Sequence, residues 1–160
     1  MHELFDDPRL TISGLLFEAT SGLIAKVEPT WHAHGLSGLD LNALMRLSRS
    51  PKHRLRMSDL ATQTELSTSG VTRLVDRLAK AGLVERQLDP TDRRSAYAAL
   101  TPAGISRLEE VLPDYLDALE TWLTGLLTPD QLDGLVTGLR IIRDVTNPSA
   151  TAVADPPPRS

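Results

Sequence analysis

Apolar residues in this chain recur mostly at the three- and four-residue spacing of α-helices, and the first such run spans residues 10–27. Its apolar side chains lie along one side of a predicted helix, which Pro29 should end because proline lacks the amide hydrogen that a helix interior needs. Gly14 and Gly22 each weaken this helix by up to about 1 kcal/mol relative to alanine. We therefore expect the helix to depend on packing against another surface.

A second apolar pattern in the middle of the chain predicts two short helices joined by a tight turn. Ser58 should cap the first helix and Ser67 the second, since a serine hydroxyl can accept a hydrogen bond from a free amide at a helix start. The second helix should end at Gly82, a residue that readily adopts positive φ. Two such helices are typical of a helix-turn-helix. The apolar positions of the second are Val71, Leu74, Val75 and Leu78.

Two strands are predicted directly after Gly82, over residues 83–88 and 95–100. Asp89-Pro90-Thr91-Asp92 between them is typical of a turn, and the basic pair Arg93-Arg94 follows it. A hairpin with a basic tip after a helix-turn-helix indicates a winged helix-turn-helix. Leu55 and Met57 should form a short first strand that pairs with this wing.

The C-terminal part of the chain predicts further helices. Thr101-Pro102 and Thr128-Pro129 should each begin one, with the hydroxyl at the N-cap and proline at the first helical position. Pro113 lies inside the first of these patterns and should kink the helix or split it in two. Residues 147–160 have no periodicity and four prolines, so we expect a disordered tail.

The charge of this 160-residue chain is unevenly distributed. The formal net charge is −4, yet residues 36–101 carry seven acidic and eleven basic residues. Residues 1–35 carry five acidic and two basic residues, and residues 102–160 carry nine and four. A basic centre between acidic flanks favours a nucleic-acid surface over a random distribution of charge.

Other function classes find little support. The chain has no cysteine, which excludes disulfides, thiolate metal sites and a thiol redox switch. No apolar run approaches transmembrane length and no signal pattern opens the chain, so we expect a cytoplasmic protein with no membrane partner. An enzyme is not expected, because the sequence contains no glycine-rich phosphate loop and no evident nucleophile with its base.

Several motifs between Leu74 and Gly104 share the order and spacing of one known family. These are Leu74-Val75-Asp76-Arg77-Leu78, Gly82-Leu83-Val84-Glu85-Arg86, Asp89-Pro90-Thr91-Asp92-Arg93-Arg94 and Leu100-Thr101-Pro102-Ala103-Gly104. On these residues the chain resembles the MarR family of bacterial transcriptional regulators. The motifs cover under a third of the chain, and the flanking helices also fall where that family places its dimerisation helices.

The resemblance implies a mainly α fold with a small β-wing. Residues 1–35 would form an N-terminal dimerisation helix and linker, 36–101 the winged helix-turn-helix lobe and 102–146 the C-terminal dimerisation helices. It also implies a homodimer that binds a pseudo-palindromic operator in double-stranded DNA, usually as a repressor, with half-sites about 10 bp apart. No cofactor is expected.

Members of this family bind small aromatic acids between the first two helices and the DNA-binding lobe. Trp31, His32 and His34 would line such a pocket by their position. The two histidines could instead be hydrated loop residues or contribute to a metal site, because imidazole suits zinc, copper or nickel, although no third ligand is evident.

The second helix of the predicted pair should place its N-terminal half in the major groove. Arg73 is the long donor of that half and would contact guanine O6 and N7 bidentately, or phosphate alone. Arg77 and Lys80 lie farther along and should contact phosphate. The predicted contacts are Ser67, Thr68, Ser69, Thr72, Arg73, Arg77 and Lys80.

The resemblance places the last arginine of the wing motif, Arg94, in the minor groove, with Arg93 beside it. A narrow A·T-rich minor groove attracts arginine, and Asp92 would orient the side chain through a charge-assisted hydrogen bond. Alternatively, Asp89 and Asp92 serve only to form the turn. The earlier basic run over residues 46–56 could likewise contact phosphate or form a solvated loop.

Two other readings of the function stay open at this point. The protein could be a regulator without small-molecule input. It could also be a winged-helix module for dimerisation or protein contact that does not meet DNA, although such a module would have no use for the arginines of the second helix and the wing.

Overall fold

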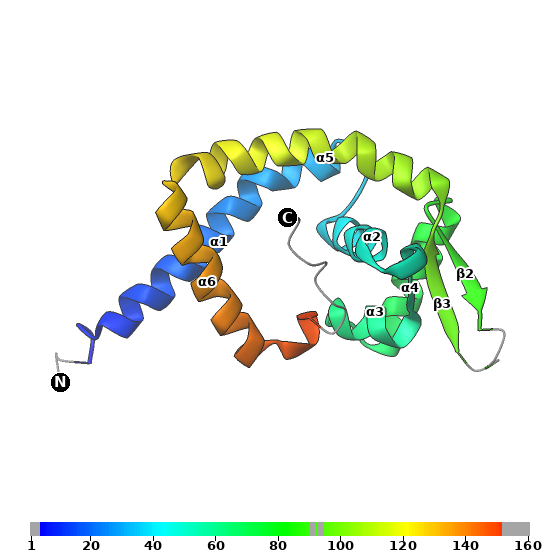
Figure 1. The fold of residues 1–160 in the computed structure, drawn as a ribbon, viewed down its shortest axis with the longest axis horizontal. Coiled ribbons are helices and arrows are strands. Elements are labelled where there is room, and N and C mark those ends of the chain that lie inside the picture. The colour runs from blue at the N-terminus through cyan, green and yellow to red at the C-terminus, as the bar shows by residue number, and fades with distance from the viewer. Residues whose placement is uncertain (1–3, 90–91, 93–94, 152–160) are drawn as a thin grey trace.

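The computed structural model describes residues 4–89, 92 and 95–151 and is mainly helical, with a three-stranded sheet (Figure 1). The N-terminal elements are α1 (Pro8–His32), α2 (Gly38–Arg49), η1 (Pro51–His53), β1 (Arg54–Arg56), α3 (Met57–Gln63) and α4 (Thr68–Lys80). The C-terminal elements are β2 (Val84–Leu88), β3 (Ala96–Leu100), α5 (Pro102–Trp122), η2 (Thr124–Leu126), α6 (Pro129–Thr146) and η3 (Pro148–Thr151). The mainly α fold with a small β-wing is therefore confirmed.

The long helix α5 connects the two parts of the molecule. In Figure 1 it crosses the top, with α2, α3, α4 and the sheet below one end and α6 descending from the other. α1 packs along α5. The sheet has the order β1-β3-β2 and is antiparallel, with Leu55 opposite Ala98 and Val84 opposite Leu100. The predicted first strand thus exists, although Met57 already belongs to α3.

The core lies mostly in the lobe formed by α2, α3, α4 and the sheet. The apolar face predicted for α4 is buried, which confirms the helical spacing of its sequence. α6, by contrast, contributes no buried residue, and α1 contributes only Val27 and Trp31. The largest fully buried side chains are those of Leu44, Leu47, Leu60, Leu74, Val71, Val75 and Val111.

Most predicted helix ends are confirmed. Ser67 caps α4 by accepting a hydrogen bond from the amide of Gly70, and Gly82 follows its C-cap with φ of 75°. The assignment of Ser58 as the N-cap of the first short helix is wrong. β1 runs directly into α3, so that Arg56, held in the sheet opposite Tyr97, occupies the N-cap position without a side-chain bond.

The two internal prolines do not break their helices. α1 begins at Pro8, after the N-cap Asp7, and continues through Pro29 to His32. α5 continues through Pro113, so of the two predicted alternatives, a kinked or a split helix, the split is wrong. Both prolines lie at exposed positions, where water can bind the backbone carbonyl that loses its helical partner.

The predicted disordered tail is wrong for its first residues. Residues 148–151 form η3, which contacts α3 of the lobe, and the amide group of the Asn147 side chain donates to Glu65 Oε1. The chain therefore returns from α6 to the helix-turn-helix, although nothing in the local sequence pattern indicates it.

α1 is 25 residues long and, by length and composition alone, apolar enough to cross a membrane. The expectation that no apolar segment reaches that length is therefore incorrect, because neutral Ser, Thr and Gly residues extend the apolar stretch. Its large side chains are largely exposed in the single chain; Ile12 is 67% and Phe17 70% exposed. A helix of this kind requires a covering surface.

Candidate nucleic-acid interface and adjoining cavity

The N-terminal half of α4 presents short polar side chains to solvent. Thr68 and Ser69 are exposed, and the Ser67 hydroxyl, besides capping the helix, lies 3.1 Å from the hydroxyl of Ser69. Thr72 donates to the carbonyl of Thr68 at 2.9 Å. A Cβ at Gly70 would lie 3.2 Å from Ser67 Oγ, so this glycine serves the tight helix-turn-helix packing.

Arg73 and Lys80 are the exposed cations of α4 that the lobe leaves available. Within the part of the chain that the structure describes, neither side chain has a hydrogen-bond or ion-pair partner. Arg73 lies one turn after the exposed hydroxyls, on a helix whose opposite face is buried. The exposed polar face of α4 is therefore held rigidly and could enter a groove of double-stranded DNA.

Arg77 differs from these two cations because Asp40 holds its side chain. Arg77 Nη2 donates to Asp40 Oδ1 at 2.5 Å, across from α4 to the first turn of α2. Asp40 is 6% exposed, and its other oxygen accepts from the amide and hydroxyl of Ser37, the N-cap residue with which it forms the capping box of α2. Burial alone would raise the pKa of Asp40, but the bonds from Arg77 and Ser37 outweigh it and lower that pKa.

The base of the wing is fixed by arginines from β1. The guanidinium of Arg54 stacks 4.6 Å from the ring centre of Tyr97 and donates to Gln87 Oε1 at 3.1 Å. Arg56 Nε donates to the Tyr97 hydroxyl at 3.3 Å, and its Nη2 lies 3.5 Å from Asp89 Oδ2. These contacts attach the hairpin of two five-residue strands to β1.

The wing tip is described only in part. Arg93 and Arg94 lie outside the described residues. Asp92 is exposed; its carbonyl accepts from the amide of Ser95 at 2.9 Å and its carboxylate from the Ser95 hydroxyl at 2.8 Å. Asp89 is buried and accepts a hydrogen bond from Tyr97. Both aspartates therefore shape the hairpin, while the predicted orienting role of Asp92 stays a prediction.

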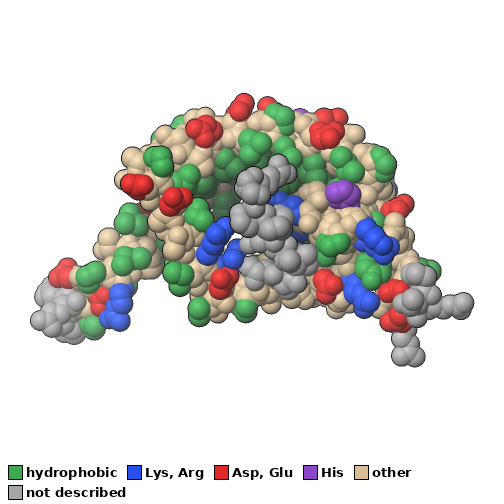
Figure 2. Space-filling model, viewed as in Figure 1, with side chains coloured by type: hydrophobic (Ala, Val, Ile, Leu, Met, Phe, Trp, Pro, Cys, Tyr) green, Lys and Arg blue, Asp and Glu red, His purple; other side chains and the backbone are tan. Residues whose placement is uncertain are grey.

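A cavity of about 630 Å³ adjoins the lobe and opens beneath α5, where Figure 2 shows hydrophobic side chains within a hollow. Its apolar end contains Trp31, whose ring meets that of Tyr115 edge-on at 5.8 Å. The lining residues are Trp31, Gly38, Leu41, Asn42, Met45, Arg46, Arg49, Ser50, Gln63, Leu112, Tyr115, Leu116, Leu119, Arg143 and Ala150.

The structure brings Trp31 to this cavity but neither of the predicted histidines. His32 lies on the exposed side of α1, where its ring nitrogen is 3.6 Å from Glu28. His34 faces α5, with Nε2 3.3 Å from Asp114 Oδ2. The described residues contain no group of three or more side chains suited to hold a metal ion.

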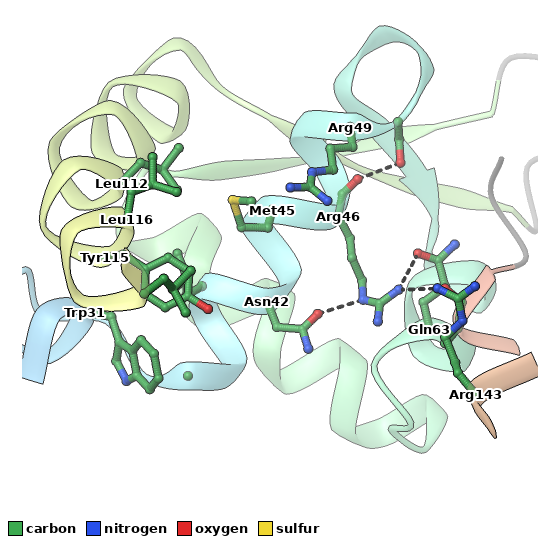
Figure 3. A pocket seen from close by; sticks show the side chains of 15 residues that line it. Trp31, Asn42, Met45, Arg46, Arg49, Gln63, Leu112, Tyr115, Leu116 and Arg143 are labelled. Carbon is green, nitrogen blue, oxygen red and sulfur yellow. Dashed lines mark hydrogen bonds between the residues drawn. The ribbon is translucent and has the colours of Figure 1, made fainter. Parts of the chain in front are cut away.

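The opposite end of the cavity is polar, and sequence reasoning missed it. Figure 3 shows the guanidinium of Arg46 between Asn42 and Gln63, with Arg143 beyond Gln63. Arg46 Nε donates to Asn42 Oδ1 at 2.7 Å and Nη1 to Gln63 Oε1 at 3.3 Å. Burial lowers the pKa of Arg46. The basic run over residues 46–56 thus supplies a cavity and the wing base, a division that its composition does not indicate.

Comparison with known proteins agrees with this geometry. A sequence profile of the MarR family matches residues 34–95. The chain is 29% identical over 140 residues to the transcriptional repressor MprA of Escherichia coli K12, covering 86% of this chain and 80% of MprA. These proteins are transcriptional regulators and not enzymes, as expected.

Solved structures show the same similarity. AbsC, a MarR family regulator from Streptomyces coelicolor, is 31% identical with a TM-score of 0.81, covering 87% of this chain and 94% of AbsC. Sco3205 of the same organism, solved in complex with DNA, is 29% identical with a TM-score of 0.79, covering 85% and 89%. BpsR of Bordetella bronchiseptica, whose DNA binding 6-hydroxynicotinic acid regulates, is 25% identical with a TM-score of 0.72, covering 83% and 93%.

Proposed function

This chain belongs to the MarR family of transcriptional regulators, and we propose that it binds a pseudo-palindromic DNA operator as a homodimer and represses transcription. The observation that carries the proposal is the exposed start of α4, where short hydroxyl side chains lead to Arg73. A buried helix face behind them and a wing fixed by Arg54 and Arg56 give this surface a definite shape.

Direct readout would come from α4. Arg73 can donate two hydrogen bonds to guanine in the major groove, while the exposed hydroxyls and Lys80 meet phosphate. Arg77 contributes less to DNA than the sequence suggests, because Asp40 already holds its guanidinium. The wing, with Arg93 and Arg94, would follow the adjacent minor groove. The relative Sco3205 has been solved in complex with DNA, which supports DNA binding over a module that never meets DNA.

Dimerisation would cover the apolar surfaces that a single chain leaves exposed. These surfaces lie on α1 and α6, which are long helices with few or no buried residues. Two lobes related by a two-fold axis would then read half-sites about 10 bp apart. The protein would act in the cytoplasm, where bacterial DNA lies.

The cavity would bind a small effector, and its two unlike ends suit an aromatic acid. The apolar end offers Trp31, Met45 and Tyr115 to a ring, while Arg46 at the polar end attracts a carboxylate. BpsR, whose DNA binding 6-hydroxynicotinic acid regulates, supports this ligand class. An effector weakens DNA binding only through a difference in its affinity for the two states of the dimer.

The test is recovery of genomic fragments by the purified protein at physiological salt, followed by sequencing. We expect enrichment of an inverted repeat near the gene of this protein. Uniform recovery that disappears as salt rises would leave only the sequence-independent electrostatic attraction and would contradict a specific operator. Sedimentation at the same concentration measures the dimer independently.

A further inference from the structure

The polar end of the cavity contains a cation that no acid pairs with directly. Arg46 is held by the neutral side chains of Asn42 and Gln63 and by the backbone carbonyl of Ala150, 3.4 Å from its Nη1. No carboxylate lies within 4.0 Å of it among the described residues. The neighbouring Arg143 differs, because Asp144 accepts from its Nη2 at 2.9 Å.

Two buried donors on the cavity wall also lack partners. Nε2 of Gln63 and Nε1 of Trp31 have no hydrogen-bond acceptor within the described part of the chain, although the residues are only 5% and 8% exposed. A buried donor is normally satisfied. Gln63 Nε2 belongs to the same side-chain amide whose oxygen accepts from Arg46. An acceptor group placed beside this amide could therefore bind both Gln63 Nε2 and the Arg46 guanidinium.

Among the described residues, the C-terminal turn already places an acceptor at Arg46, although not at Gln63 Nε2. Ala150 is part of η3, and its carbonyl lies at the long end of hydrogen-bond distance from Arg46. Asn147, just before η3, bonds to Glu65 in the turn between α3 and α4 and to the carbonyl of Arg143 at the end of α6. Glu65 itself has φ of 56°. The turn thus connects α6 with the helix-turn-helix.

We propose that η3 and an anionic effector compete for Arg46, so that effector binding releases the C-terminal turn from α3. The effector is a compact aromatic carboxylate whose ring lies near Met45 and Tyr115. Its carboxylate replaces the Ala150 carbonyl at Arg46 and accepts from Gln63 Nε2. This inference rests on the proposed effector function and specifies its regulation.

The release has a consequence for DNA binding. With η3 in place, Asn147 and Ala150 hold the helix-turn-helix against the end of α6 and so keep the lobe in a fixed orientation. Without it, the link through Glu65 is lost, and the lobe can turn relative to the dimerisation helices. The turn therefore stabilises the DNA-binding arrangement, and the effector opposes it by displacement.

The experiment uses three chains: full length, one ending at Thr151 and one ending at Thr146. Benzoate is the probe, titrated by calorimetry. The chain ending at Thr146 should bind benzoate about tenfold more tightly than the other two, as expected when a charged hydrogen bond no longer has to be displaced. The same chain should bind the operator fragment more weakly, and benzoate should weaken it no further.

Equal benzoate affinity in all three chains would overturn the competition. Absence of benzoate binding in all three would overturn the anion site, and titration of full-length protein with the operator fragment decides the DNA-binding function separately. If circular dichroism shows that the chain ending at Thr146 does not fold, the full-length variant Asn147→Asp takes its place in the comparison. The new carboxylate is repelled by Glu65 and so loosens the C-terminal turn. Unchanged benzoate affinity in that variant would again contradict the proposal.

Discussion

The substitution Asp40→Asn tests how the recognition helix is anchored to the rest of the lobe. Asp40 lies in the first turn of α2, and its carboxylate joins the capping box of that helix to Arg77 of α4. Asparagine is nearly the same size and keeps one acceptor oxygen, but it removes the charge. We expect a less stable protein that still folds.

The expected loss follows from the contacts that asparagine weakens. A hydrogen bond to a charged group contributes about 1.5–3 kcal/mol when it is buried. The Arg77 side chain is 55% exposed, so solvent screening reduces its bond with Asp40 to about 1 kcal/mol. The weakened capping box adds a few tenths of a kcal/mol. The free energy of unfolding should therefore fall by about 1.5 kcal/mol.

The stability difference between the native protein and Asp40→Asn should depend on pH. The pKa of Asp40 is lowered in the folded state, so its ionised form stabilises the fold above the pKa of the unfolded chain. That contribution is constant from neutral pH down to about pH 5 and disappears as the pH falls through the folded-state pKa, which lies below the ordinary aspartate value. The difference between the native protein and Asp40→Asn should shrink over the same acidic range.

The assay is urea unfolding at a fixed protein concentration, because the proposed dimer would gain stability with concentration. Asp76→Asn is the matched control, since Asp76 forms an exposed pair with Arg86 at 3.4 Å and should contribute less than about 0.5 kcal/mol. A loss at Asp40 no larger than the loss at Asp76, or a difference that does not shrink at any acidic pH at which the protein still folds, would refute the reasoning.

Three further predictions concern DNA and packing. Arg94→Ala should weaken operator binding about tenfold or more while sedimentation still shows the dimer; unchanged affinity in a gel shift would exclude the wing from binding. Arg73→Ala should reduce sequence preference in a competition with altered operators, whereas Lys80→Ala should weaken binding to all sequences alike; equal losses would assign Arg73 to phosphate. Gly104→Ala places a Cβ 2.2 Å from a backbone carbonyl oxygen and should lower the free energy of unfolding by about 3 kcal/mol or more, while the exposed Ala103→Gly should lower it by less than about 1 kcal/mol.

The lobe was predictable because its signals are local. The apolar spacing of α4, the cap at Ser67 and the positive φ at Gly82 each depend on neighbours within a few residues. The N-cap at Thr128, which lies outside the lobe, belongs to the same class. Such features follow from residue type and spacing and need no knowledge of the remaining fold.

The failures have a different physical origin. Whether Pro29 or Pro113 ends a helix depends on whether the released carbonyl reaches water, which is decided by tertiary packing. Arg46 belongs to a basic run that resembles a surface charge, and its partial burial accompanies its contacts with Gln63 of α3 and Ala150 of η3. His34 and Asp114 are 80 residues apart in sequence, so their contact depends on the path of α5.

Because α5 is one unbroken helix, it can convert a small tilt at one end into a larger displacement at the other. Its 21 residues measure about 32 Å at 1.5 Å per residue. The helix is firmly attached at the wing end, where the amide of Thr101 donates to the carbonyl of Leu83 at 3.1 Å and the Thr101 hydroxyl to that of Gly82 at 2.7 Å. A tilt of roughly 5° at the α6 end would therefore swing the wing by about 3 Å, on the order of one hydrogen-bond length. The helix acts as a lever arm (Figure 1), so a small rearrangement at the α6 end becomes a much larger displacement of the wing.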